Sequence, residues 1–144
     1  MKKVKVISIA LGVISLTFGL LKFVSPFKDW YATQIETSGL PPATYALGIA
    51  GEIMVGIAFL VPFITVTTMK QKRFVLLFAN ISLGLIMIAA TIVHLIPDVP
   101  ASVLPLKIKP PFIPLAFLGV AIYNLTKLSV KHLQVDLAEH SNRK

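Results

Sequence analysis

Four long apolar runs dominate the chain, and short polar segments separate them. They cover about residues 4–24, 44–66, 74–96 and 111–130. Each is close to the ~20 residues that a helix needs to cross the hydrocarbon core of a bilayer. A helix satisfies its own backbone hydrogen bonds in lipid, so the pattern predicts an all-α, polytopic membrane protein with four transmembrane helices. We expect one domain over residues 1–130, followed by a polar tail over residues 131–144.

The segments between the runs differ in length and composition. Residues 25–43 include Trp30 and Tyr31, whose amphipathic rings favour a membrane interface, and a proline pair there begins the second span. Residues 97–114 carry six of the chain's ten prolines, which predicts an extended lid because proline removes backbone donors and stiffens the chain. The connection between the second and third runs is short, so these two spans are expected to be antiparallel neighbours.

Basic residues gather on alternate connections. Ten lie at the two termini and between the second and third runs: Lys2, Lys3, Lys5, Lys70, Lys72, Arg73, Lys127, Lys131, Arg143 and Lys144. The opposite side has only Lys28, Lys107 and Lys109, with Lys22 just inside the first span. The positive-inside rule therefore places both termini in the cytoplasm and predicts an antiparallel four-helix bundle. The net charge of +8 then reflects topology and not a nucleic-acid partner. We expect a multi-pass protein of a bacterial inner (plasma) membrane.

Composition narrows the chemistry. Hydrophobic residues make up 56% of the chain and charged residues 14%, against about 25% charged in soluble domains. The absence of cysteine excludes disulfides, thiol catalysis, iron–sulfur clusters and zinc–thiolate sites. The chain lacks paired carboxylates at a diagnostic spacing and the common nucleotide, hydrolase and metalloprotease motifs. We therefore expect no metal, no covalent cofactor and no self-contained enzyme. The basic start resembles a signal peptide, but no small-residue cleavage site follows, so we expect it to be retained.

One acid interrupts the second apolar run. Glu52 lies about 12 Å from the start of its span, where a carboxylate costs several kcal/mol unless it is paired, hydrogen-bonded or protonated. Lys22 and His94 reach the same outer half of the bundle by independent estimates of depth. Gly48 and Gly56 share the helical face of Glu52 and would let a neighbouring helix approach. The three ionisable side chains are therefore the candidate ligand-binding site, with simple structural pairing as the alternative.

The third run carries a polar stripe at steps of four and three residues. Its members are Asn80, Gly84, Met87, Thr91 and His94. We include Met87 and Thr91 as candidate ligand contacts, although packing would equally explain them. We expect Asn80 to meet Asn124 of the fourth span. The candidate helix-packing glycines are Gly12, Gly19, Gly48, Gly56 and Gly84.

These features together resemble the DoxX family of small four-helix membrane proteins. The resemblance rests on FGLLKF (18–23), GIAGEIMVGIAFL (48–60) and AATIVHL (89–95) and covers roughly residues 5–128. A basic residue late in the first helix and a glutamate in the second recur in that family, and Lys22 and Glu52 match those positions. The resemblance implies membership of membrane oxidoreductase complexes in some relatives and an assembly role in others.

The leading hypothesis is a DoxX-like membrane subunit with an outward-opening pocket at Glu52, Lys22 and His94. The pocket would hold a small amphiphile, a quinone head group or a lipid-like ligand. A redox partner subunit would supply the electrons, so the chain would be at most one subunit of a quinone-linked oxidoreductase. The alternatives are a non-enzymatic assembly or chaperone subunit with a structural Glu–Lys pair, and a proton-coupled transporter, which four helices without inverted repeats suit poorly. The sequence leaves the oligomeric state open, a homo-oligomer included.

Overall fold

Every regular element is a helix over the residues that the computed structural model describes, 2–65 and 68–141, with side chains described through Ser129. Its elements are α1 (Lys2–Leu21), α2 (Phe27–Thr37), α3 (Ala43–Ile64), α4 (Met69–Leu95), the short 3-10 helices η1 (Ala101–Val103) and η2 (Pro105–Lys107), and α5 (Phe112–Ser141). The predicted all-α class is confirmed for this part of the chain.

Four of these helices are long and apolar enough to cross a membrane. They are α1, α3, α4 and the part of α5 from Phe112 to Ser129. Their outward faces carry large apolar side chains, and Leu47 on α3 and Phe74 on α4 are 69% and 72% exposed. So much exposed apolar surface is typical of a protein surrounded by lipid. The structure and composition are therefore those of a multi-pass membrane protein.

Two helix boundaries differ by five residues or more from those predicted. Helix α4 begins at Met69, five residues before the predicted start, because Thr68 and Gln71 form a capping box that supports a polar first turn. Helix α5 continues to Ser141, beyond the predicted end near residue 130. Hydropathy detects where a helix is apolar, whereas a capped or extended polar turn is equally helical. The segment predicted as an extended lid contains the two short 3-10 helices.

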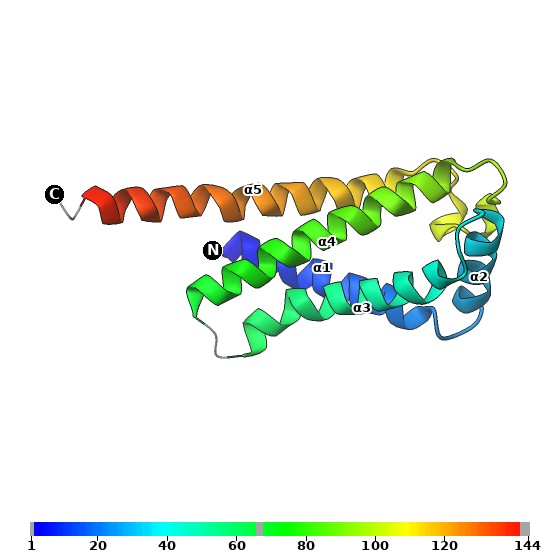
Figure 1. Ribbon diagram of the computed structural model, residues 1–144, viewed down its shortest axis with the longest axis horizontal. Helices are drawn as coiled ribbons and strands as arrows, with labels where there is room; N and C mark the ends of the chain where they lie inside the picture. Colours follow the sequence, from blue (N-terminus) through cyan, green and yellow to red (C-terminus); the bar gives the residue numbers. More distant parts are fainter. Residues whose placement is uncertain (1, 66–67, 142–144) are drawn as a thin grey trace.

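The connections divide the molecule into two ends (Figure 1). Helix α2 and the segment 96–111 lie together at one end, which we call the capped end. The start of α1, the end of α3 and the start of α4 lie toward the other, which we call the basic end for its lysines and arginine. Helix α1 packs mainly on α3 and α5 mainly on α4, while α3 and α4 join the two pairs. Helices α1 and α5 contact each other much less.

Polar side chains contact one another across the helices in two groups, and an apolar core lies between these two layers. The basic-end layer consists of Ser8, Asn80 and Asn124, and the capped-end layer of Lys22, Tyr31 and Glu52. The core is built from Leu11, Val55, Phe59, Leu76, Ala79, Leu83, Ala121 and Leu128. Along α1, Ser8 and Lys22 are about 21 Å apart at 1.5 Å per residue. The two layers are therefore distinct sites.

Candidate functional site

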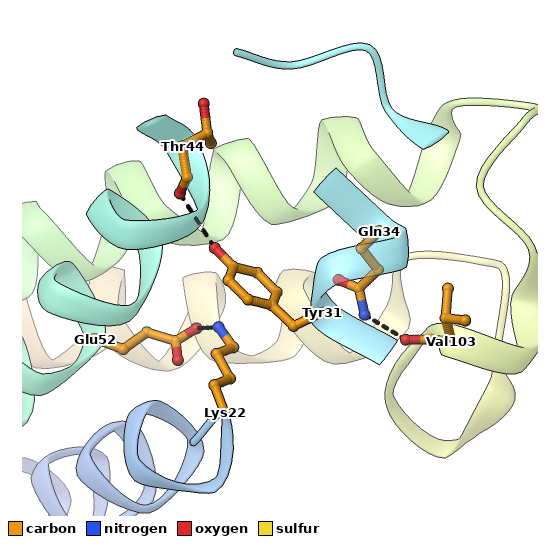
Figure 2. Close-up of polar contacts among 6 residues, drawn as sticks. All are labelled: Lys22, Tyr31, Gln34, Thr44, Glu52 and Val103. Atoms are coloured by element: carbon orange, nitrogen blue, oxygen red, sulfur yellow. Dashed lines mark hydrogen bonds and ion pairs between the residues drawn. The ribbon is translucent and has the colours of Figure 1, made fainter. Parts of the chain in front are cut away.

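The centre of the capped-end layer is an ion pair between α1 and α3. Lys22, the first residue after α1, donates from Nζ to Oε1 of Glu52 at 2.7 Å (Figure 2). The two side chains are only 14% and 15% exposed. The structure thus brings together two of the three ionisable residues that the sequence places at this depth. Pairing offsets the cost of placing either charge in an apolar environment.

Close contact of α1 with α3 sets the position of this pair. A Cβ added to Gly56 would lie 2.7 Å from the backbone nitrogen of Leu16. One added to Gly19 would lie 2.7 Å from Cγ1 of Ile53, and one added to Gly12 would lie 2.9 Å from Leu60. These contacts leave no room for a side chain, so the three glycines let the helix backbones approach.

Tyr31 on α2 covers the ion pair from the capped end. Nζ of Lys22 lies 3.9 Å from the centroid of the Tyr31 ring, a cation–π contact (Figure 2). The phenol reaches the carbonyl oxygen of Thr44 at 3.4 Å. It fits against Gly48, where an added Cβ would overlap the phenolic oxygen. Gly48 therefore makes room for Tyr31 and not, as expected, for another spanning helix.

The environment of Tyr31 keeps its phenol protonated. Burial, then repulsion from the Glu52 carboxylate, then Tyr45, raises its pKa to about 12. The sequence pattern predicts Tyr31 only as an interfacial aromatic. The missed signal is its spacing from Ile35, four residues later, because both side chains are buried on one face of α2.

One oxygen of the acid has no hydrogen-bond partner. Oε1 of Glu52 accepts from Lys22, whereas Oε2 is buried and accepts nothing from the described residues. A buried carboxylate oxygen without a donor is costly, and a carboxylate accepts several hydrogen bonds. The site therefore has acceptor capacity for a hydroxyl or amine donor, beside a lysine that offers positive charge.

His94 lies in a different environment. It is 3% exposed, and its Nδ1 is 3.3 Å from the carbonyl oxygen of Lys109. The Lys109 ammonium in turn donates to the carbonyl oxygens of Ile96 and Val99, just after the end of α4. Within residues 2–129, no hydrogen bond or ion pair links His94 to Glu52 or Lys22. His94 therefore fastens the segment 96–111 to α4.

The other candidates on α4 make ordinary helix contacts. Thr91 donates its hydroxyl to the carbonyl oxygen of Met87 at 2.8 Å, within the same helix. Met87 packs partly buried against the apolar core. A Cβ added to Gly84 would lie 3.7 Å from Leu118, so this glycine is not required by a close approach. None of these three contacts involves the ion pair.

Contacts across the capped end join α2 to the segment 96–111. The Gln34 side-chain amide donates to the carbonyl oxygen of Val103 (Figure 2). Trp30 packs against the buried cluster of Val93, Val99, Val103 and Leu104. Two segments far apart in the sequence thus form a single cap, with Tyr31 on its inner face.

The basic-end layer is neutral and fully buried. The Nδ2 of Asn124 lies 3.2 Å from Oδ1 of Asn80, which confirms the predicted contact, and 3.0 Å from Oγ of Ser8, a contact that was not predicted. Ser8 precedes Gly12 by four residues and so extends the stripe of small residues on α1. Three helices are joined by this layer, which offers hydrogen bonding but no charge.

Within the described residues, no group of three His, Asp or Glu side chains is arranged to hold a metal ion. The chain matches no family model, none of the curated proteins and no solved structure.

Proposed function

We propose that this chain is a DoxX-like membrane protein whose Glu52–Lys22 site binds the head group of a small amphiphile, namely a quinol or quinone. The bundle is antiparallel, with both termini in the cytoplasm and the capped end outside a bacterial inner membrane. The observation that carries the proposal is the buried Oε2 of Glu52, which has no donor within the described structure. A quinol hydroxyl is a donor of the right kind, and its isoprenoid tail suits a site between membrane-spanning helices.

The chemistry assigned to the chain is proton acceptance and positioning. Lys22 donates to Oε1 of Glu52 at 2.7 Å and so leaves Oε2 as the unoccupied acceptor of the carboxylate. Oε2 accepts a hydrogen bond from a head-group hydroxyl and takes its proton when the quinol is oxidised. The two electrons of the quinol pass to a redox-active partner subunit, and the proton of its second hydroxyl passes to water at the capped end. His94 has no part in this scheme because its contacts are with the segment 96–111.

Binding of a decyl-tailed benzoquinol to the detergent-purified full chain tests the proposal. Glu52→Gln keeps the side-chain volume but removes the charge, so we expect at least tenfold weaker binding. Glu36→Gln is the matched control, because Glu36 is an exposed acid on α2. Undiminished affinity in Glu52→Gln would contradict the site, and absence of binding by the unaltered chain would contradict the ligand class.

A second candidate function is favoured by the ion pair itself. A short, nearly buried Lys22–Glu52 pair beside the Gly19 contact is also what a purely structural link between α1 and α3 requires. The chain would then be an assembly subunit without a ligand. The charge swap Lys22→Glu/Glu52→Lys separates the two. If the pair is only structural, the swapped chain folds and neither it nor the unaltered chain binds quinol. If the pair is a binding site, the unaltered chain binds quinol and the swapped chain folds but does not bind it.

A transport function has less support. Phe59 and Leu83 are 0% and 1% exposed and lie in the apolar core between the two polar layers. A polar solute crossing between the layers would meet these apolar side chains and, on α1, the single buried hydroxyl of Ser15. Proton-coupled flux in proteoliposomes is therefore not expected.

A further inference from the structure

The side of the bundle where α1 and α5 face each other carries an apolar groove that neither Glu52 nor Lys22 lines. Its volume is about 300 Å³, and its lining residues are Val6, Ile7, Ala10, Leu11, Ile14, Ala116, Phe117 and Val120. The groove exists because α1 packs on α3 and α5 packs on α4, which leaves α1 and α5 in limited contact. An unfilled groove forfeits dispersion contacts along both helices, so an apolar occupant would be stabilising.

The length of the groove suits an acyl chain in one leaflet. From Val6 to Ile14 it extends about 12 Å along α1, close to the ~15 Å hydrocarbon depth of a single leaflet. Two alanines, Ala10 and Ala116, line it and are exposed, so it is open toward lipid. An acyl chain can therefore enter from the side.

The two walls of the groove continue into basic residues at the basic end. On α1, Lys3 precedes Ile7 by four residues and so shares the lining face. On α5, Tyr123 and Lys127 continue the face of Val120, and Nζ of Lys127 lies 5.3 Å from the centroid of the Tyr123 ring. Both lysines are exposed. Cations at one end of an acyl-sized groove complement the phosphate of a lipid.

Among residues 2–129, no ion pair or hydrogen bond joins an acidic side chain to Lys3 or Lys127. All four acids among residues 2–129 belong to the capped-end half: Asp29, Glu36, Glu52 and Asp98. Lys2 and Lys5 add further positive charge next to Lys3. Electrostatic attraction of an anionic head group to this end is worth about fivefold in affinity for each basic residue.

We propose that the α1–α5 groove is a binding site for an anionic phospholipid. One acyl chain lies between Ala10 and Ala116, and the phosphate lies between Lys3 and Lys127. The lipid fills the weakest interface of the bundle and so joins the α1–α3 pair to the α4–α5 pair. This site is separate from the Glu52 site, and neither proposal depends on the other.

Native mass spectrometry of the full chain in mild detergent tests the proposal. Equimolar dioleoyl phosphatidylglycerol and dioleoyl phosphatidylcholine are added, and each bound lipid is counted. We expect phosphatidylglycerol to be retained at least fivefold over phosphatidylcholine. Equal retention of the two lipids would overturn the proposed phosphate contact.

Paired variants test each half of the site, with helicity checked by circular dichroism. Lys3→Gln/Lys127→Gln should bring the ratio of retained phosphatidylglycerol to phosphatidylcholine close to one. The control Lys70→Gln/Lys72→Gln removes the same amount of charge at the same end and should leave this ratio unchanged. An equal loss in both would indicate general surface attraction and contradict the site.

Larger side chains in the groove test whether an acyl chain occupies it. Ala10→Leu/Ala116→Leu should lower retention of both lipids severalfold, whereas Ala50→Leu/Ala89→Leu, at exposed alanines of α3 and α4, should leave it unchanged. If the groove variant instead dissociated a dimer and left lipid retention unchanged, a second copy of the chain would be the occupant and the lipid proposal would be wrong.

Discussion

The two polar layers solve the problem of burying polarity in a membrane protein in different ways. The basic-end layer is neutral, fully buried and made of short side chains that bond across three helices. The capped-end layer is charged, slightly exposed and covered by a separate helix, α2. Neutral hydrogen-bonding side chains position helices at low energetic cost. A buried charge, in contrast, is stable only while its oppositely charged partner stays in place. That dependence makes the capped-end layer the more sensitive one and the better suited to exchange with a ligand.

The strongest test of this contrast removes the partner of one buried charge. Lys22→Met removes the partner of Glu52 and should lower the free energy of unfolding by about 3 kcal/mol, because the carboxylate is then buried without its cation. The measurement is unfolding of the purified chain in mixed micelles. Lys28→Met is the control, since Lys28 is exposed on α2 and its loss should cost less than ~0.5 kcal/mol. The double variant Lys22→Met/Glu52→Gln should recover most of the loss. A loss of equal size in both single variants would show that the pair has no special role.

A somewhat smaller effect is expected at Gly56 of α3, which packs closely on α1, the helix that runs between the two layers. Gly56→Ala places a Cβ 2.7 Å from the backbone of Leu16, and a backbone atom cannot move aside cheaply. We expect about 2 kcal/mol of destabilisation, as for overpacked cores, together with weaker quinol binding. Gly119→Ala is the matched control because its added Cβ meets nothing within 4 Å. Equal stability of the two variants would contradict the close contact between α1 and α3.

The basic-end layer should be the more tolerant. Asn124→Leu removes both amide hydrogen bonds, to Asn80 and to Ser8, and should cost about 1 kcal/mol, the usual scale for such bonds between membrane helices. Quinol affinity should not change, because the apolar core separates this layer from Glu52. Thr126→Val, an exposed hydroxyl bonded within its own helix, is the control. A drop in quinol affinity in Asn124→Leu alone would show that the layers are coupled.

Much of the architecture was predictable because lipid imposes strong constraints on sequence. Apolar runs of sufficient length reveal the spanning helices, and counting residues gives the depth of each polar side chain. Depth alone placed Lys22, Glu52 and His94 at one level. It could not give the direction in which each side chain points, which depends on how the helices rotate against their neighbours. His94 points to the segment 96–111, and only Lys22 meets Glu52.

The cap was the hardest part to predict. Tyr31 and Gln34 make their contacts with residues 13 and 69 positions away, and no periodic pattern reports such pairings. Glycine spacing was informative for Gly56, which meets α1, but misleading for Gly48, which meets Tyr31. A small residue indicates that something approaches closely, and the identity of the approaching group follows only from the fold.

The smallest expected effect is spectroscopic and measures the link between the cap and the acid. The pKa of Tyr31 is raised to about 12 by burial first and by the Glu52 carboxylate second. Glu52→Gln removes the second cause, so the pKa should fall, though burial keeps it above the ordinary value of 10.0. Because the folded state favours the neutral phenol, its contribution to stability is complete below pH 10 and is lost as pH rises toward 12. Ultraviolet absorbance titration of phenolate formation measures this, with Tyr31→Phe identifying the transition among the three tyrosines. An identical Tyr31 pKa in Glu52→Gln and in the unaltered chain would mean that the charge of Glu52 does not affect the phenol. Helix α2 would then cover the ion pair without electrostatic coupling to it.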